Sequence, residues 1–261
     1  MLCHWIPEKK LKIDGLCQNH HPCALQIIQK KINIIKKNTI MNKMTWQNLS
    51  LNPNAVHLLE KEPDRVDWWY LSKNPNAIHI LEREPEKIIW LFLSSNLNAI
   101  HMLEREPEKI NWFYLSANPN AISILEANPD RVDWHNLSAN PNAIHMLERE
   151  PEKINWDYLS KNPNAVHILE QNLDKINWRC LSCNRNAVHI LEQNQDKIHW
   201  ENLSKNPNAI DILEKNLDKI EWGYLSSNPN AISILEKNQD KINWVNLSKN
   251  PSIFEEDYAC K

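Results

Sequence analysis

Cysteine and histidine are the residues of this chain whose types and spacing come nearest to a chemical site. Cys17, His20, His21 and Cys23 stand close together near the N-terminus. Thiolates and imidazoles can bind zinc, and a terminal segment with a small hydrophobic core gains the most stability from a bound metal. The spacing matches no standard zinc finger, so we predict no metal site and keep these four residues as the best candidates.

Two further patterns contain residues that could carry chemistry. Cys180 and Cys183 form a single CxxC pair, and a histidine column recurs with the period of the chain at His57, His79, His101, His145, His167 and His189. Equivalent atoms of stacked helical units lie about 10 Å apart, too far for two imidazoles to share one ion. We therefore expect partly exposed histidines on a helix face.

Catalytic motifs are missing from the printed sequence. It contains no glycine-rich phosphate loop, no HExxH motif and no nucleophile elbow. We predict a protein that is not an enzyme and that uses no cofactor.

The elements that carry these residues follow a fixed period. Tryptophans stand 22 residues apart, without insertion or deletion, at Trp46, Trp68, Trp90, Trp112, Trp134, Trp156, Trp178, Trp200, Trp222 and Trp244. A period of this size indicates a solenoid, in which each unit packs only on its neighbours.

Each repeat has two places where a short helix could begin. Asn206 and Pro207 offer an N-cap and a first-turn proline, and Asn128–Pro129–Asp130 opens the second half with an acid in the first turn. Two glycines against fifteen prolines argue against tight hairpins. We predict an all-α fold, an α-solenoid of tandem 22-residue helix-pair repeats with N- and C-terminal caps. The alternative is a leucine-rich-type horseshoe with a short strand at each Lys-Ile-Asn-Trp.

Three segments are predicted along one continuous solenoid. Residues 1–45 form a degenerate N-terminal cap repeat with a basic helix, residues 46–250 the regular array, and residues 251–261 a C-terminal cap. The first segment carries eight lysines and two acids, or +6, so the remainder carries −9 of the net −3. The negative charge of the array argues against a protein that binds along the phosphate backbone of a nucleic acid.

Cysteine usage and hydropathy bear on the compartment. The six cysteines form no regular disulfide framework, which favours reduced thiols and a cytoplasmic location. The N-terminus has no apolar segment of signal-peptide length, and no run approaches the roughly 18 apolar residues of a membrane span. We expect neither secretion nor contact with a membrane.

Two columns of the repeat are expected to be structural. Each tryptophan stands beside Ile and Leu at interior spacing, which predicts a buried ladder between helix layers. The recurrent glutamates are expected to be solvated or paired with lysine one period away; they include Glu82, Glu104, Glu148 and Glu170.

The position directly after each tryptophan differs in every repeat. These ten residues, here called the variable column, are Gln47, Trp69, Leu91, Phe113, His135, Asp157, Arg179, Glu201, Gly223 and Val245. A buried position would restrict size and polarity, so we predict that the column is exposed and binds the partner. Trp69, Leu91 and Phe113 are the predicted apolar anchor, and Asp157, Arg179 and Glu201 the polar selectors.

The repeat block LSxNPNAIxxLExNxxKIxW, with its leader Trp5-Ile6-Pro7-Glu8-Lys9-Lys10-Leu11, resembles tandem-repeat proteins that giant double-stranded DNA viruses of protists encode in many copies. The resemblance covers residues 5 to 254, although Ile13 stands where tryptophan is expected. It implies binding to host proteins. We therefore predict a non-enzymatic scaffold for protein–protein interaction in the host cytoplasm, of unknown oligomeric state.

Single-stranded RNA or DNA binding, with one base read per repeat, is the alternative function. It requires a basic column that faces the phosphates. Lys73, Lys161, Lys205 and Lys249 form only part of one, which is interrupted by Ser95, Ala117, Ala139 and Cys183.

Overall fold

The computed structural model describes residues 1–35 and 43–255, with only the backbone for residues 32–35. All regular elements in this part of the chain are helical, and the single β-bridge, Leu2 with Phe254, is isolated. The all-α prediction is confirmed, and the horseshoe with a strand in each repeat is wrong. Residues 36–42 of the predicted basic helix and 256–261 of the predicted C-terminal cap lie outside the described residues.

Contacts divide the chain into two units, each described by itself. The terminal unit comprises Met1–Ile88 and Ile220–Lys261, and the middle unit comprises Ile89–Lys219.

Each repeat has a helix that contains its tryptophan and, from α5 onward, begins at it; a second short helix and a 3₁₀ turn follow. The Trp helices are α3 (Lys43–Leu51), α5 (Trp68–Leu71), α7 (Trp90–Leu93), α9 (Trp112–Ser116), α11 (Trp134–Ser138), α13 (Trp156–Leu159), α15 (Trp178–Leu181), α17 (Trp200–Leu203), α19 (Trp222–Leu225) and α21 (Trp244–Leu247). The second helices are α4 (Val56–Leu59), α6 (Ile78–Arg83), α8 (Ile100–Arg105), α10 (Ile122–Ala127), α12 (Ile144–Arg149), α14 (Val166–Glu170), α16 (Val188–Gln193), α18 (Ile210–Glu214) and α20 (Ile232–Lys237).

The 3₁₀ turns follow the second helices, and each carries one acidic residue followed by one basic residue. They are η3 (Pro63–Arg65), η4 (Pro85–Lys87), η5 (Pro107–Lys109), η6 (Pro129–Arg131), η7 (Pro151–Lys153), η8 (Leu173–Lys175), η9 (Gln195–Lys197), η10 (Leu217–Lys219) and η11 (Gln239–Lys241). The two ends of the chain add η1 (Glu8–Lys10), α1 (Ile13–Leu16), α2 (Pro22–Ile35), η2 (Pro53–Ala55) and η12 (Pro251–Ile253).

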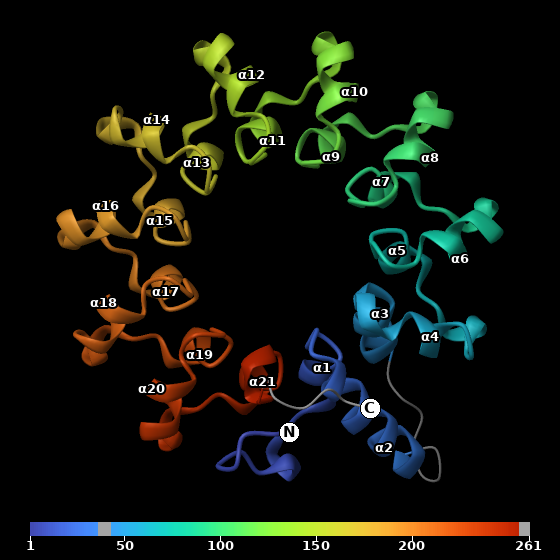
Figure 1. The fold of residues 1–261 in the computed structure, drawn as a ribbon, viewed down its shortest axis with the longest axis vertical. Coiled ribbons are helices and arrows are strands. Elements are labelled where there is room, and N and C mark those ends of the chain that lie inside the picture. Colours follow the sequence, from blue (N-terminus) through green and yellow to red (C-terminus); the bar gives the residue numbers. More distant parts are fainter. Residues whose placement is uncertain (36–42, 256–261) are drawn as a thin grey trace. The chain divides into compact units, whose positions relative to one another are not determined.

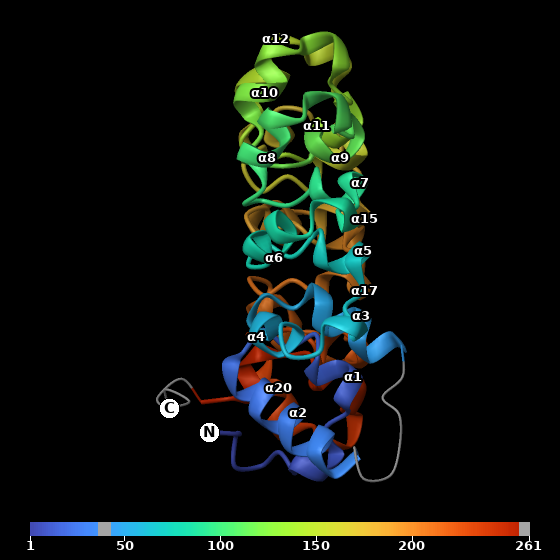
Figure 2. The same ribbon diagram turned by 90° about the vertical axis from the view of Figure 1, so that its right-hand side faces the viewer.

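Two rows of helices make up the middle unit. The Trp helices from α7 to α17 form one row, on the inside of this unit's curve, and α8 to α18 form the other row (Figure 1). Figure 2 shows the same separation from the side, with α8 and α10 on one side and α7 and α9 on the other. Consecutive repeats therefore stack along two parallel seams.

The proline-containing starts do not begin α-helices as the sequence suggested. Pro129–Arg131 makes only one 3₁₀ turn, and Val132 is extended before α11 begins at Trp134. Asp133 is the actual N-cap, because its side chain accepts a hydrogen bond from Asn136 N. Likewise, α18 begins at Ile210, after the turn that follows Asn206.

Leucine and alanine supply the apolar core of every repeat. Leu137, Ala143 and Leu147 are all fully buried, and the equivalent positions of the other repeats match them. Burying such side chains is the main source of stability, and a single short helix pair cannot do it alone. Each repeat needs its neighbours.

A buried polar ladder joins consecutive repeats. The Nδ2 of Asn140 donates to Ser116 O and Asn118 O, both at 3.0 Å, and its Oδ1 accepts from Asn142 N. The same double donation recurs at Asn74, Asn118, Asn162, Asn184, Asn206 and Asn250. At Asn206 the Oδ1 still accepts from Asn208 N at 3.0 Å, as an N-cap side chain does, so the ladder is a second role of this residue.

In the terminal unit the N-terminal segment takes the place of a repeat between the last and the first regular repeats. Asn19 Nδ2 donates to Ser248 O at 3.2 Å and to Asn250 O at 2.8 Å. In turn, Asn52 Nδ2 donates to Cys17 O and Asn19 O. The helix α1 packs against both α21 and α3. The two ends that the sequence presented as separate caps therefore contact each other.

Candidate functional site

The variable column lies in the Trp helices, directly after each tryptophan, and is mostly exposed. Seven of its ten residues are exposed, among them Trp69 (58%), Phe113 (50%) and Val245 (46%). Gln47, Glu201 and Gly223 are partly buried. The expectation of exposure is therefore met at most positions, and the binding role stays a prediction.

The predicted anchor residues are divided between the two units. Trp69 belongs to the terminal unit, and Leu91 and Phe113 to the middle unit. In the middle unit the Phe113 ring meets Tyr114 edge-on at 5.3 Å, and Tyr114 lies 5.9 Å from Phe92. Leu91, Phe92, Phe113 and Tyr114, from α7 and α9, are called the aromatic patch below.

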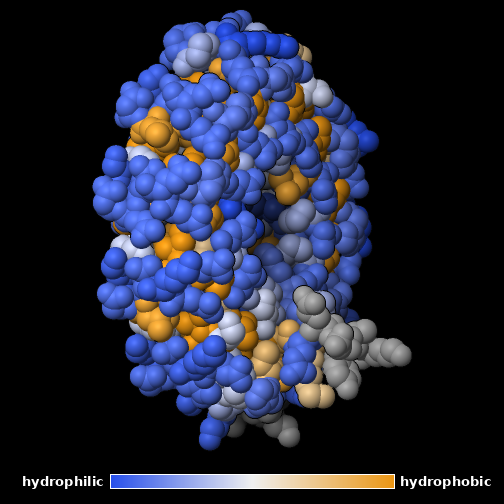
Figure 3. All heavy atoms as spheres, turned by 60° about the vertical axis from the view of Figure 1, so that its left-hand side comes forward, coloured by the Kyte–Doolittle hydropathy of each residue, from blue (hydrophilic) through white to orange (hydrophobic). Residues whose placement is uncertain are grey.

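Other apolar side chains come to the surface away from the variable column. On the face in Figure 3, hydrophobic side chains form separate patches between hydrophilic ones. Leu97, Leu173 and Leu217 are each more than two-fifths exposed. All three stand where most repeats have proline or a polar residue, so they are useful controls for the column.

The tryptophans are not the buried ladder that the sequence predicted. Only Trp46 is buried (6% exposed), and the other nine of the periodic set are partly buried. Each indole from Trp46 to Trp222 lies under the cation that stands 19 residues later, as Trp134 lies under Lys153, with Nζ 4.5 Å from the ring centroid. The stems of Lys and Arg cover apolar surface while their charges stay in water, and a cation over an indole face is attracted to it.

The cation column is complete, and sequence reasoning missed it. The remaining pairs are Arg65 over Trp46, Lys87 over Trp68, Lys109 over Trp90, Arg131 over Trp112, Lys175 over Trp156, Lys197 over Trp178, Lys219 over Trp200, Lys241 over Trp222 and Lys10 over Trp244. The available signal was a Lys or Arg at the third position before every tryptophan after the first. Because a cation already lies over each ring, the structure gives no support to a surface on which bases or sugars would stack against the tryptophans.

The glutamate and histidine columns pair with each other. His145 Nε2 lies 2.8 Å from Glu126 Oε1, and His79, His167 and His189 make the same contact to Glu60, Glu148 and Glu170. Glu148 and Glu170 are about half exposed, as expected of solvated side chains, and their ion-pair partners are histidines rather than lysines. At Glu60 the guanidinium of Arg83 also reaches Oε1, at 3.2 Å. Hydrogen bonding by His79 is the first cause that lowers the pKa of Glu60.

We expect His79→Ala to raise the pKa of Glu60 toward its ordinary value of 4.5. The hydrogen bond and the charge of His79 favour the ionised carboxylate, and removing them weakens that preference. Because the pKa of Glu60 is lower in the folded protein than in the unfolded chain, its ionised carboxylate stabilises the folded state fully above the unfolded-state pKa. This contribution to stability is lost as the pH falls through the folded-state pKa of Glu60. Carboxyl-carbon NMR titration measures the change, and Arg83→Ala should produce a smaller rise. An unchanged titration of Glu60 in His79→Ala would contradict the assignment.

The cysteine and histidine cluster near the N-terminus does not assemble into a ligand set. Cys17 is buried, and burial raises the pKa of its thiol to about 12. Cys23 is disulfide-bonded, and the His21 ring stacks on Phe254 at 4.8 Å. No group of three or more potential ligands that could hold a metal is present in residues 1–35 and 43–255.

The cysteines also correct the expectation of reduced thiols throughout. Cys3, Cys17, Cys180 and Cys183 are free, but Cys23 is oxidised. Cys260, the sixth cysteine, lies outside the described residues.

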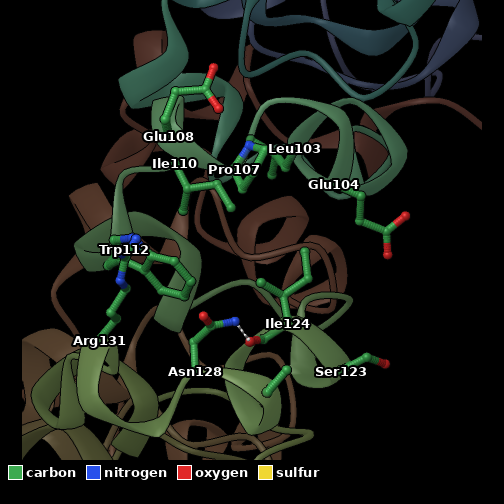
Figure 4. A pocket seen from close by; sticks show the side chains of 11 residues that line it. Leu103, Glu104, Pro107, Glu108, Ile110, Trp112, Ser123, Ile124, Asn128 and Arg131 are labelled. Carbon is green, nitrogen blue, oxygen red and sulfur yellow. Dashed lines mark hydrogen bonds between the residues drawn. The ribbon is translucent and has the colours of Figure 1, made fainter.

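A pocket of about 590 Å³ opens in the middle unit between α8 and η5 of one repeat and α10 and η6 of the next. Leu103, Ile110 and Ile124 line it with apolar surface. Figure 4 shows Glu104 and Ser123 along one edge and Trp112 with Arg131 along the opposite edge. Sequence reasoning treated Glu104 only as one of the recurrent glutamates and did not predict a pocket.

Fold and surface together define the class as an all-α tandem-repeat protein with an invariant polar ladder and a variable exposed column. No protein-family model, curated protein or solved structure matches the chain. None of the helices in the described ranges has both the length and the apolar character required to cross a membrane.

Proposed function

We propose that this chain is a non-enzymatic scaffold that binds a protein partner through the variable column. One observation carries the proposal: seven of ten column residues are exposed on a frame whose buried ladder repeats almost unchanged. Sequence freedom confined to exposed positions of a regular frame is where repeat proteins usually place specificity.

Within the middle unit, the column changes from apolar to charged. Leu91 and Phe113 are exposed beside their aromatic neighbours, and Asp157 and Arg179 follow two and three repeats after Phe113. Aromatic side chains anchor interfaces, and charges around them select the partner and set the association rate. The aromatic patch is the proposed anchor here, and exposed Trp69 serves the same role in the terminal unit.

Host proteins are the proposed partners, because the repeat block resembles those of giant viruses. A cytoplasmic location is part of the same proposal. Single-stranded nucleic acid is the competing ligand, and a salt-dependent mobility shift with RNA would favour it over protein. The ten cations held over tryptophans lower the number available for phosphates.

We expect Leu91→Ser combined with Phe113→Ser to weaken partner capture by at least about tenfold, since interface anchors typically contribute more than about 2 kcal/mol. The measurement is quantitative affinity capture from a protist host lysate, with the helical circular dichroism spectrum checked for both proteins. Leu173→Ser is the matched control, because Leu173 is 45% exposed but lies outside the variable column. Equal losses in the double variant and the control, or no loss in either, would refute the column as the binding surface.

A further inference from the structure

The pocket of the middle unit lies where two side chains of the repeat are shortened. Ser123 occupies the position that is histidine in six other repeats. Ala127, one helical turn later in α10, occupies a position that elsewhere holds Arg, Lys or Gln. Both residues line the pocket, together with Glu104 of the preceding repeat. Only this repeat has a short side chain at both positions, so its own sequence accounts for the pocket.

The equivalent place two repeats earlier shows what the missing side chains do. Glu60 corresponds to Glu104, and its Oε1 receives His79 Nε2 at 3.0 Å and Arg83 Nη2 at 3.2 Å. Ser123 and Ala127 correspond to His79 and Arg83 and can supply neither an imidazole nor a guanidinium. At Glu104 the carboxylate remains while both cationic groups have gone.

The lining of the pocket defines what could replace them. Leu103, Ile110 and Ile124 provide an apolar surface, and Glu104 stands at the edge. Glu108 adds a second carboxylate, whereas the one guanidinium of the lining, Arg131, lies over the Trp112 ring at 5.3 Å. The set is net acidic, and the volume of about 590 Å³ lies within the range of about 300–1,000 Å³ of ligand pockets.

We propose that this pocket binds an arginine side chain of a peptide or protein partner, with the guanidinium on Glu104 and the stem over the apolar lining. Arginine fits better than lysine, because its planar guanidinium can pair with a carboxylate through two hydrogen bonds and is more weakly hydrated. The partner brings from outside the groups that other repeats supply from their own chain. This site is separate from the variable column, and neither depends on the other.

The test uses the full chain with ¹³C-labelled isoleucine methyl groups and the peptide acetyl-Leu-Arg-Leu-amide. Saturable shifts of the Ile110 and Ile124 methyl signals are expected. The citrulline peptide, which has the same shape but no charge, should bind at least about tenfold more weakly, as loss of a charge-assisted hydrogen bond implies. Equal affinity for the citrulline peptide, or no saturable shift at millimolar peptide, would overturn the proposal. Binding by the lysine peptide at equal strength would also overturn the preference for a guanidinium.

Two variants locate the site. The double variant Ser123→His/Ala127→Arg introduces the two residue types that contact Glu60 two repeats earlier. It should therefore fill the pocket and abolish the methyl shifts without loss of thermal stability. Glu104→Gln, which alters only the carboxylate, should weaken binding by at least about tenfold. Glu148→Gln is the matched control, because Glu148 already pairs with His167, and it should leave peptide affinity unchanged. Undiminished binding in both the double variant and Glu104→Gln would remove the pocket from consideration.

Discussion

Asn140→Ala is expected to unfold about 5–15 °C below the parent protein, for a loss of about 2–4 kcal/mol. The side chain is fully buried and makes three hydrogen bonds to the backbone, two of them to the preceding repeat. Alanine removes the two donors that reach Ser116 O and Asn118 O. A buried carbonyl that loses its donor keeps the cost of desolvation, so the loss exceeds that of an exposed hydrogen bond.

Asn142→Ala is the matched control within the same repeat. Asn142 is exposed, and its Nδ2 donates to a single carbonyl, that of Pro119, at 2.9 Å. Water can replace that donor, so we expect a loss below about 1 kcal/mol. Thermal unfolding followed by circular dichroism compares the two proteins. Similar decreases of the melting temperature in both variants would show that burial does not determine how much the hydrogen bonds of Asn140 contribute to stability.

Alanine at the two glycines of the chain is expected to change stability in opposite directions. Gly15→Ala should destabilise the protein by about 1–3 kcal/mol, the usual cost of overpacking a close contact. A Cβ at Gly15 would stand 2.6 Å from both Ser248 Cβ and Val245 O. Since neither atom belongs to the flexible end of a side chain, α1 or α21 must move. Gly15 does not have a positive φ, so the need is for close approach rather than for an unusual backbone conformation.

Gly223→Ala has the opposite expected sign. Gly223 lies in α19, and nothing stands within 4 Å of a Cβ built there. Replacing an unhindered helical glycine by alanine stabilises by about 0.5–1 kcal/mol, because the unfolded chain loses freedom. Urea denaturation of the two variants gives both signs in one experiment.

Amide hydrogen exchange locates the Gly15 effect. Faster exchange of Lys12 N, which donates to Ser248 Oγ at 2.8 Å, should accompany the loss of stability in Gly15→Ala. Protection of Lys12 equal to that in the parent would mean that the contact between α1 and α21 tolerates the added methyl group.

The repeat could be predicted from the sequence because residues close together in the chain define it. A tryptophan every 22 residues and prolines at constant positions indicate short helices stacked in series, and the structure is all-helical with that period. The exposure of most of the variable column also followed from residues alone, since positions such as Asp157 and Arg179 could not share one buried slot with Leu91 and Phe113.

Local rules failed at the start of each helix. Asn206 has the residue type of an N-cap and its Oδ1 accepts from Asn208 N, but α18 begins only at Ile210. Its Nδ2 also donates to two carbonyls of the preceding repeat. The helix that follows the proline turn begins only at the tryptophan, where a closer Asn or Asp caps it. An N-cap preference concerns only the side-chain oxygen, so it could not show that the Nδ2 of the same residue completes two buried backbone hydrogen bonds of the preceding repeat.

The sequence by itself determined the period, the helical class, the absence of recognisable catalytic motifs and the positions free to vary. Only the tertiary structure decided which columns meet: lysine over tryptophan, histidine on glutamate, Asn19 on the last repeat, and the pocket beside Ser123. The reason is physical. In a perfectly periodic chain every column recurs at the same separation, so spacing cannot show which two come into contact. The stagger of one repeat on the next selects those pairs, and the stagger is set by packing and by the buried hydrogen bonds between repeats.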